Sequence, residues 1–322
     1  MHTCSSGLTR PLQLYTDFDG TLTTVDTLSA LSQLPRTPYK PWSYFVDAYL
    51  KDLELYLPLI PVPESPSPDN RTTLPQEAEY LASYLPIERR SVERLERAKY
   101  FAGFSAAQLR QHGFESVITG VVGIRDGWWE LLACLNKHHI KHTISVISVN
   151  WSAEFIRGVL SGSYRLWCHQ QGFTPTGSLS VVDTISIYSN DLLISHETHL
   201  TTGNFSRRYP APVDRGIWTA EDKLDVMTEL LNNTPQHTNA VTIYMGDSPL
   251  DLLCLLKADM GIIVGRGKEL VETCNRLGLL VEEGRDGPSV RGEVGSRLFR
   301  IEIFGEVLKW FKGCEGEVDI GG

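Results

Sequence analysis

Two aspartates stand one residue apart in the stretch TDFDGTLTT, residues 16–24. They are Asp17 and Asp19, and the apolar run LQLY before them predicts a short buried strand that ends at this point. Two carboxylates held close together can attack an electrophile, exchange protons with it, or bind a divalent cation. The plain alternative is a turn that happens to be acidic, so the choice depends on which other residues come to the same place.

Polar residues also follow two later apolar runs. Ser148 ends HTISVIS, and Asp247 ends AVTIYMGD, with Asp251 four residues further on. Both runs are rich in β-branched residues, which predicts buried strands. Because ligands of an open parallel sheet bind beyond the carboxyl ends of its strands, we expect these side chains to lie near Asp17.

A lysine is expected at the same edge of the sheet. Lys223 lies near the start of TAEDKLDVMTELLNN, which has the apolar spacing of a helix. Thr219 is a good N-cap for this helix, and acidic residues occupy its first turn, where the helix dipole favours them. A chance turn explains any one of these polar elements, but it explains the whole set much less easily.

The elements that must position these residues alternate between strand and helix over most of the chain. This alternation predicts an α/β fold, a doubly wound and mostly parallel sheet with helices on both faces. Within it we expect a helix over about 151–160, a strand over about 164–169 and a last helix over 296–312. The 322 residues are enough for one large domain or two ordinary ones.

One segment differs from the rest in composition and in the spacing of its apolar residues. Residues 27–118 are aromatic, rich in leucine and charge, and helical in spacing. They predict a helical cap domain inserted into a core made of residues 1–26 and 119–322. Within the cap, the proline-rich run at about 61–75 predicts an exposed loop.

Composition narrows the class of protein. The net charge of −9 offers no broad basic surface, so we expect no binding to nucleic acid. No run approaches the length of a membrane span, and the first residues lack the apolar centre of a signal peptide, so a cytoplasmic protein without a membrane partner is expected. The six cysteines are scattered singly, which predicts neither a cysteine metal site nor a disulfide framework.

The motifs together resemble those of the haloacid dehalogenase superfamily of phosphatases. The resemblance covers roughly residues 10–30 and 120–285. Its residues are the DxDGT motif Asp17-Phe18-Asp19-Gly20-Thr21, the strand SVIS that ends at Ser148, Lys223, and the GDxxxD motif Gly246-Asp247-Ser248-Pro249-Leu250-Asp251. The layout is similar to the phosphoserine-phosphatase-like branch, in which a helical cap is inserted after the first motif.

The resemblance implies a Mg²⁺-dependent phosphatase that acts on a small phosphorylated metabolite through an aspartyl phosphate. Asp17 would be the nucleophile, because a carboxylate can attack phosphorus and split a difficult hydrolysis into two steps. Asp19 would protonate the leaving oxygen and then activate water. Lys223 would neutralise the nucleophile and a phosphate oxygen, and Ser148 would hydrogen-bond the phosphoryl group.

The same resemblance implies a set of Mg²⁺ ligands. Magnesium prefers oxygen ligands and commonly binds through one or two carboxylates, substrate phosphate and waters. Asp17 and Asp247 would supply the carboxylates, and Asp19 would contribute its backbone carbonyl. Asp251 would anchor the site from behind or act as an occasional ligand.

Two positions depart from the pattern of the branch. Many members have a glycine pair after the serine of the second motif, whereas this chain has Val149-Asn150-Trp151, so we expect Asn150 to add a hydrogen bond to the phosphate. Phosphoserine phosphatases carry a glutamate nine residues after the nucleophile, and here that position is Asp26. Asp26 is expected to contact an amine or hydroxyl of the substrate, but it does not identify phosphoserine.

Other functions with the same motifs stay open from the sequence. A phosphomutase or phosphotransferase would keep both aspartates of the first motif. A dehalogenase needs the nucleophile but not Asp19, so the second aspartate argues against it. A catalytically inactive member that binds a partner is disfavoured, because every core motif is retained.

Overall fold

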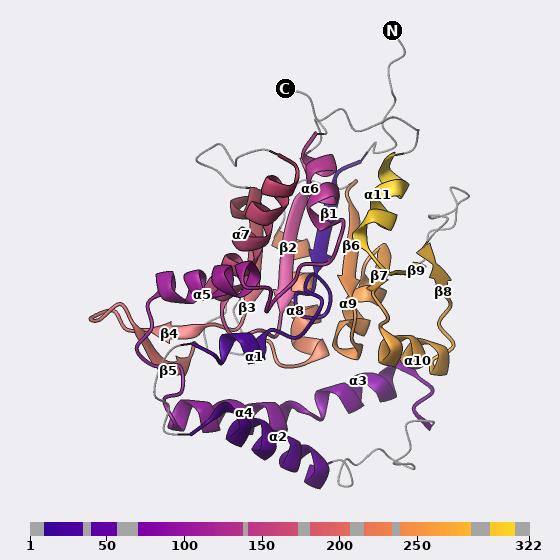
Figure 1. Cartoon of the computed structure of the whole chain (residues 1–322). Helices are drawn as coiled ribbons and strands as arrows, with labels where there is room; N and C mark the ends of the chain where they lie inside the picture. Colours follow the sequence, from indigo (N-terminus) through magenta and orange to yellow (C-terminus); the bar gives the residue numbers. More distant parts are fainter. Residues whose placement is uncertain are drawn as a thin grey trace.

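The computed structural model describes residues 10–34, 40–56, 70–137, 141–172, 181–206, 216–233, 239–284 and 297–312. Within these residues, seven strands form one sheet in the order β3-β2-β1-β6-β7-β9-β8 (Figure 1). The strands are β1 (Leu12–Thr16), β2 (Thr143–Ser148), β3 (Ile185–Ser189), β6 (Val241–Gly246), β7 (Met260–Val264), β8 (Val281–Glu283) and β9 (Arg297–Ile301). All neighbouring pairs run parallel, which confirms the predicted fold class.

Helices cover both faces of the sheet. The face that contains Leu14 of β1 packs against α6 (Trp128–Lys137), α7 (Ala153–Gln170) and α11 (Phe304–Lys312). The face that contains Tyr15 packs against α8 (Ala220–Asn233), α9 (Leu252–Lys257) and α10 (Lys268–Arg276). Consecutive residues of β1 therefore enter different cores, as expected for a strand that is buried on both sides.

The strand order reverses direction beside β1. The chain passes from β1 to β2 on one side, and it later returns to β6 on the other side. Ligands of open α/β sheets bind at such a switch point, beyond the carboxyl ends of the strands. Asp17 follows β1 and Asp247 follows β6, and the Asp17 N–H donates to the Met245 carbonyl at 2.8 Å. The two acidic motifs are thus joined at the switch point.

Helix α7 is longer than predicted, and no strand forms at 164–169. The reason is its close packing on α5 (Ala106–Ile118). A Cβ on Gly158 of α7 would lie 2.0 Å from the Arg110 carbonyl oxygen, so the two backbones nearly touch. Nearer the end of α7, Tyr164 packs on Trp129 of α6 and the Trp167 ring N–H donates to Glu130 at 2.8 Å, so these aromatic residues lie in a helix despite their preference for strands.

The predicted last helix over 296–312 divides into two elements. Residues Arg297–Ile301 form β9, which lies between β7 and β8, and the helix α11 begins only at Phe304. The run LFRI is interpreted as helical from the sequence, but its buried Leu298, Phe299 and Ile301 also fit a strand that is covered on both faces. Pairing with β7 decides in favour of the strand.

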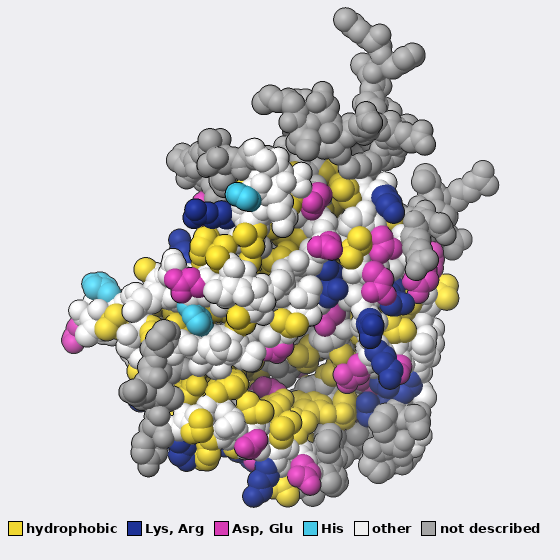
Figure 2. Space-filling view, in the orientation of Figure 1, with side chains coloured by type: hydrophobic (Ala, Val, Ile, Leu, Met, Phe, Trp, Pro, Cys, Tyr) yellow, Lys and Arg dark blue, Asp and Glu magenta, His cyan; other side chains and the backbone are white. Residues whose placement is uncertain are grey.

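Three helices form a layer beyond the carboxyl ends of the strands (Figure 1). They are α2 (Trp42–Tyr56), α3 (Leu74–Ala82) and α4 (Leu85–Arg97). Figure 2 shows a hollow between this layer and the rest of the molecule, with acidic side chains beside it. We call α2, α3 and α4 the helical layer.

The boundaries of the cap stay a prediction. Within residues 27–118, the short helix α1 (Leu28–Leu31) contacts α5, and α5 packs on α7 rather than on the helical layer. Most of the predicted proline-rich loop, residues 61–69, lies outside the described residues, while Leu74 and Pro75 already belong to α3.

Hydrogen bonds and ion pairs connect the helical layer to the rest of the molecule on two sides. On one side, the buried carboxylate of Glu77 in α3 pairs with Arg71 at 2.8 Å and with Arg276 of α10 at 2.5 Å. On the other side, β5 (Thr201–Phe205), which pairs with β4 (Leu192–Ile194), contacts the segment after α4. There the Thr201 N–H donates to the Phe104 carbonyl at 2.8 Å. The helical layer is thus attached near α10 at one end and near β5 at the other, and it extends across the carboxyl edge of the sheet (Figure 1).

Among the residues that the structure describes, no helix combines the length and the apolar character needed to cross a lipid bilayer.

Candidate active site

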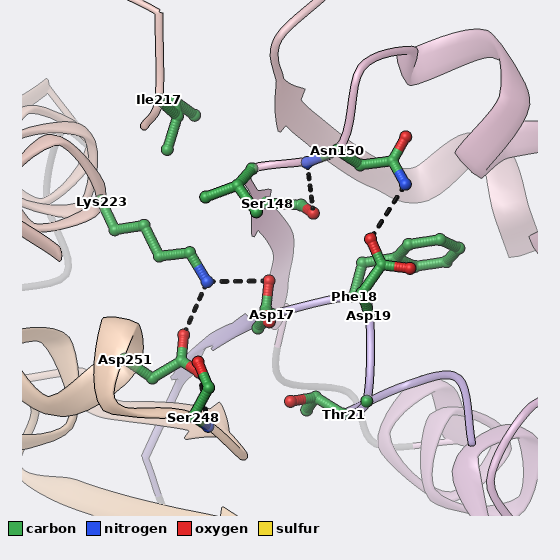
Figure 3. A network of polar contacts seen from close by, with 12 residues as sticks. Asp17, Phe18, Asp19, Thr21, Ser148, Asn150, Ile217, Lys223, Ser248 and Asp251 are labelled. Carbon is green, nitrogen blue, oxygen red and sulfur yellow. Dashed lines mark hydrogen bonds and ion pairs between the residues drawn. The ribbon is translucent and has the colours of Figure 1, made fainter. Parts of the chain in front are cut away.

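Asp17 lies at the centre of the site, in the first position after β1. Its side chain is almost fully buried, and it points toward Lys223 (Figure 3). Burial raises the pKa of the Asp17 carboxyl well above its ordinary range, and the nearby carboxylates of Asp251 and Asp247 raise it further, while Lys223 lowers it. The ionised form of Asp17 therefore depends on positive charge placed close to it.

Lys223 supplies one such charge from the first turn of α8. Its ammonium lies 2.9 Å from Asp17 Oδ1 and 2.8 Å from Asp251 Oδ1, and only 1 % of the residue is exposed. Burial lowers the pKa of Lys223, but the two carboxylates outweigh burial and raise the pKa above its ordinary value, so the lysine is charged at neutral pH. The predicted lysine of the site is thus in contact with the predicted nucleophile.

The start of α8 is fixed by a reciprocal cap. The Asp222 N–H donates to Thr219 Oγ1 at 3.2 Å, and the Thr219 N–H donates to Asp222 Oδ2 at 2.9 Å. This confirms Thr219 as the N-cap and identifies Asp222 as its partner. Because Lys223 follows Asp222 directly, the cap also fixes the position from which the lysine reaches Asp17.

Asp251 has no exposed surface and accepts five hydrogen bonds or ion-pair contacts. One oxygen accepts from Lys223 and from the Tyr244 hydroxyl at 2.9 Å. The other oxygen accepts from the Asp247 N–H at 3.2 Å and from the N–H and hydroxyl of Ser248, each at 3.1 Å. Asp251 therefore ties Lys223 to the loop that carries Asp247.

Asp247 faces the turn that follows Asp19. The Thr21 hydroxyl donates to Asp247 Oδ1 at 2.7 Å. Gly20 has a positive φ of 77°, and a Cβ at this position would lie 2.3 Å from Asp247 Oδ2, so only glycine fits. Burial, followed by the charge of Asp251, raises the pKa of Asp247 to about 6.

Asp19 points away from Lys223 and is held by two residues (Figure 3). The Asn150 amide donates to Asp19 Oδ2 at 2.9 Å, and the Thr27 N–H donates to Asp19 Oδ1 at 2.8 Å. Burial and then the charge of Asp26 raise the pKa of Asp19 to about 6, against these hydrogen bonds, which lower it. A carboxyl group with such a pKa can give and take a proton near neutral pH.

Both the nitrogen and the oxygen of the Asn150 side-chain amide form hydrogen bonds with other groups of the protein. Its nitrogen donates to Asp19 and to the Thr27 hydroxyl at 3.0 Å, and its oxygen accepts from the Trp151 N–H at 2.8 Å. The predicted contact of Asn150 with phosphate stays a prediction, because the structure holds no ligand. In the structure as it stands, Asn150 positions Asp19.

Ser148 and Asp26 lie at different depths. Ser148 ends β2 and is fully buried next to Asp17, where its hydroxyl accepts from the Asn150 N–H at 3.1 Å (Figure 3). Asp26 is exposed, and its carboxylate accepts from the Leu28 N–H at 2.8 Å. The fold thus brings together Asp17, Asp19, Ser148, Lys223, Asp247 and Asp251, and it places Asp26 at the surface beside them.

The donor set fits a divalent cation of the Mg²⁺ type. Carboxylate oxygens of Asp17, Asp247 and Asp251 all lie within 4.8 Å of one another. Within the described residues, three carboxylates face one lysine here, and burial raises the pKa of both Asp17 and Asp247. A divalent cation between these two carboxylates would supply the charge that keeps both ionised.

Three residues of the site, Tyr244, Thr27 and Arg125, were not identified from the sequence, and Thr21 was identified only as part of the DxDGT motif. The carboxylates of the site accept from Tyr244, Thr21 and Thr27, and the turn after Asp19 accepts from Arg125. The tyrosine is one of several aromatic residues in apolar strands, so nothing in its pattern points to a hydroxyl that donates to Asp251.

No family model matches the chain. The chain is 25% identical over 263 residues to a CTO1 family protein of Schizosaccharomyces pombe. The aligned residues cover 81% of this chain and 84% of that protein. It is 26% identical over 262 residues to Cold tolerance protein 1 of Saccharomyces cerevisiae, with 76% of this chain and 75% of that protein covered. Neither name specifies a chemical activity.

Solved structures with a similar course of the chain include a phospho-aspartyl intermediate analogue of phosphoserine phosphatase. The sequence identity is 11% and the TM-score is 0.41, with 94% of this chain and 100% of that chain covered. At 11% identity, this likeness assigns no role to any residue of the chain. The fold is therefore taken from the order of the strands, and the candidate site is taken from its own geometry.

Proposed function

We propose that the protein is a Mg²⁺-dependent phosphatase of the haloacid dehalogenase type that hydrolyses a small phosphomonoester through an aspartyl phosphate. The observation that carries this proposal is the pairing of a buried carboxylate, Asp17, with a buried ammonium, Lys223, at the switch point of the sheet. A second carboxylate, Asp19, is held two residues away by Asn150. A structural ion pair alone would not need this second group.

In the first half of the reaction, Asp17 attacks phosphorus while Asp19 gives a proton to the leaving oxygen. The P–O bond to the leaving group breaks as the bond to Asp17 forms. Lys223 and the Ser148 hydroxyl lie beside Asp17, where they stabilise negative charge on the phosphoryl oxygens. The alcohol then leaves as a neutral molecule, which spares the cost of an alkoxide.

In the second half, water attacks phosphorus, and the P–O bond to Asp17 breaks as the bond to water forms. Asp19, now ionised, takes a proton from the attacking water, so the same carboxyl group serves as acid and then as base. The Asn150 and Thr27 contacts keep both its oxygens in place through the cycle. Inorganic phosphate and regenerated Asp17 are the products.

Asp17 and Asp247 are the proposed carboxylate ligands of Mg²⁺, and the backbone carbonyl of Asp19 is the proposed third ligand. Bound Mg²⁺ would screen the repulsion between the nucleophile and an anionic phosphate. Asp251 fits the anchoring role better than the ligand role, because its two oxygens already accept from five donors.

The substrate is proposed to be a small phosphorylated metabolite whose leaving group lies between the helical layer and Asp26. The helical layer faces the carboxyl ends of the strands, so it can cover the acyl phosphate. Asp26 is exposed next to Asp19 and is the proposed contact for an amine or hydroxyl of the substrate. A panel of phosphorylated metabolites identifies the compound.

Hydrolysis of p-nitrophenyl phosphate tests the proposed function. The purified protein with Mg²⁺ is expected to release p-nitrophenol and inorganic phosphate in equal amounts, and excess EDTA is expected to stop both. Restoring Mg²⁺ should restore the rate, which separates metal removal from denaturation. Release of p-nitrophenol without phosphate would identify a phosphotransferase instead, and no turnover with Mg²⁺ on this ester or on the panel would reject an enzymatic role.

A further inference from the structure

Arg125 reaches from the loop before α6 to the turn that follows the nucleophile. Its backbone N–H donates to the Leu22 carbonyl at 2.8 Å. Its side chain donates through Nε to the Thr21 carbonyl at 3.1 Å and through Nη2 to the Gly20 carbonyl at 2.5 Å. One residue, about a hundred positions away in the chain, therefore binds three consecutive carbonyls of this turn.

The other side of the same turn rests on Asp247. Gly20 lies so close that a Cβ would be 2.3 Å from Asp247 Oδ2, and the Thr21 hydroxyl donates to Asp247 Oδ1 at 2.7 Å. Residues 17–22 lie outside any helix or strand, so no regular ladder fixes the turn. The turn is held by contacts with both the Arg125 guanidinium and the Asp247 carboxylate.

The guanidinium is itself well fixed. Gly265 approaches so closely that a Cβ there would lie 3.0 Å from both terminal nitrogens of Arg125, and the Glu302 carbonyl accepts from Nη1 at 3.5 Å. A planar guanidinium can bind two neighbouring carbonyls at once because its donors form a rigid fork, which an ammonium lacks. The site thus uses arginine for its shape as well as its charge.

We propose that Arg125 is a positioning residue that clamps the Gly20–Thr21 turn against Asp247 and so sets the geometry of the metal-binding carboxylates. The proposal deepens the proposed function and rests on it for its effect on turnover. Arg125 does not contact the reacting atoms. Its effect passes through the turn to Asp247, which is the kind of outer contact that orients a metal ligand.

The contacts of the Arg125 side chain make the clamp open to chemical rescue. Truncation of Arg125 to alanine would remove the guanidinium and leave a space of its size beside the Gly20 and Thr21 carbonyls. Guanidinium ion, supplied well below denaturing concentrations, is small enough to enter and to donate to the same carbonyls.

The clamp is tested by measuring Mg²⁺ binding by calorimetry in wild type, Arg125→Ala and Arg125→Lys. Loss of an outer contact of this kind is expected to weaken Mg²⁺ binding about tenfold or more in Arg125→Ala. Arg125→Lys should recover only part of the loss, because lysine cannot bind both carbonyls. With p-nitrophenyl phosphate, kcat at fixed Mg²⁺ should fall while KM changes little, and guanidinium ion should restore part of the loss in the alanine variant only.

Arg300→Ala is the matched control. Arg300 donates to the Gly265 carbonyl at 3.2 Å and pairs with Glu283 and Glu302, so it lies in the same region without touching the turn. This variant should bind Mg²⁺ as wild type does. Equal Mg²⁺ affinity in wild type and Arg125→Ala would overturn the clamp.

Hydrogen exchange separates failure of the clamp from failure of the proposed function. Amides of residues 18–24 should exchange faster in Arg125→Ala than in wild type or Arg300→Ala, whether or not the protein hydrolyses phosphate. Unchanged exchange in this segment would reject the clamp by itself. Absence of Mg²⁺ binding and turnover in wild type, together with faster exchange in Arg125→Ala, would reject the proposed function and keep the clamp.

Discussion

Asp17→Asn is expected to lower phosphatase turnover by at least about a hundredfold, which corresponds to roughly 3 kcal/mol of activation free energy. The amide has the shape of the carboxylate, but it cannot form the covalent bond to phosphorus that divides the hydrolysis into two steps. The fold should survive, because Lys223 keeps its contact with Asp251 at 2.8 Å. The measurement is kcat for p-nitrophenyl phosphate with saturating Mg²⁺, next to circular dichroism of the same sample.

The matched control for this variant is Asp225→Asn on α8. Asp225 is exposed and lies two residues after Lys223, so the control removes one carboxylate near the site without touching it. Its rate should stay within about twofold of wild type, since surface substitutions have small effects. An Asp17→Asn protein that keeps more than a hundredth of the wild-type rate would remove Asp17 as the nucleophile.

Lys223→Met is expected to cost both stability and activity. Methionine fills the volume but leaves the Asp17 and Asp251 carboxylates buried without their shared counter-charge, and breaking a buried ion pair in this way typically costs about 3–5 kcal/mol of unfolding free energy. The cost should appear as a lower urea midpoint. Turnover should also fall, because the ammonium no longer stabilises the phosphoryl oxygens.

Two further variants separate the effect of leaving buried carboxylates without a counter-charge from the general effect of replacing a lysine by methionine. Lys268→Met removes a lysine whose side chain is 84% exposed, and it should shift the unfolding free energy by no more than about 0.5 kcal/mol. Lys223→Met combined with Asp251→Asn removes one of the stranded carboxylates and should regain part of the lost stability without regaining turnover. A Lys223→Met protein as stable and active as wild type would contradict the ion-pair network as the centre of the site.

The positions of the main proposed catalytic groups could be predicted from the sequence because each one lies at the end of a strand or the start of a helix. Apolar runs end at Thr16, Ser148 and Gly246, and the parallel sheet places these ends side by side. Lys223 was equally accessible to sequence reasoning, since its helix begins at an N-cap that the sequence displays. These inferences need only local pattern and the rule for where parallel sheets bind ligands.

The contacts between these groups could not be predicted, because they join residues far apart in the chain. Asn150 lies 131 positions from Asp19, and its amide could serve a phosphate or a carboxylate equally well as far as the sequence tells. Arg125 stands in the run GIRDG, residues 123–127, which looks like an ordinary turn. Only the fold reveals that it reaches the turn after Asp17.

The errors in secondary structure have the same origin. The end of α7 has aromatic residues that favour a strand, but Tyr164 and Trp167 contact α6 there and the helix continues. The run over 296–312 has spacing that fits a helix, but the edge of β7 pairs with its first part. In both segments a tertiary contact outweighs local preference.

The most direct test of the account is to locate the phosphoryl group on the protein. With p-nitrophenyl phosphate, whose leaving group needs little proton donation, Asp19→Asn should complete the first half of the reaction and stall in the second, because no base activates water. After an acid quench, mass spectrometry should find one phosphoryl group on the peptide that contains residue 17, and the double variant Asp17→Asn, Asp19→Asn should carry none. A phosphoryl group on any other residue, or an Asp19→Asn protein that turns over at the wild-type rate without accumulating one, would contradict the account.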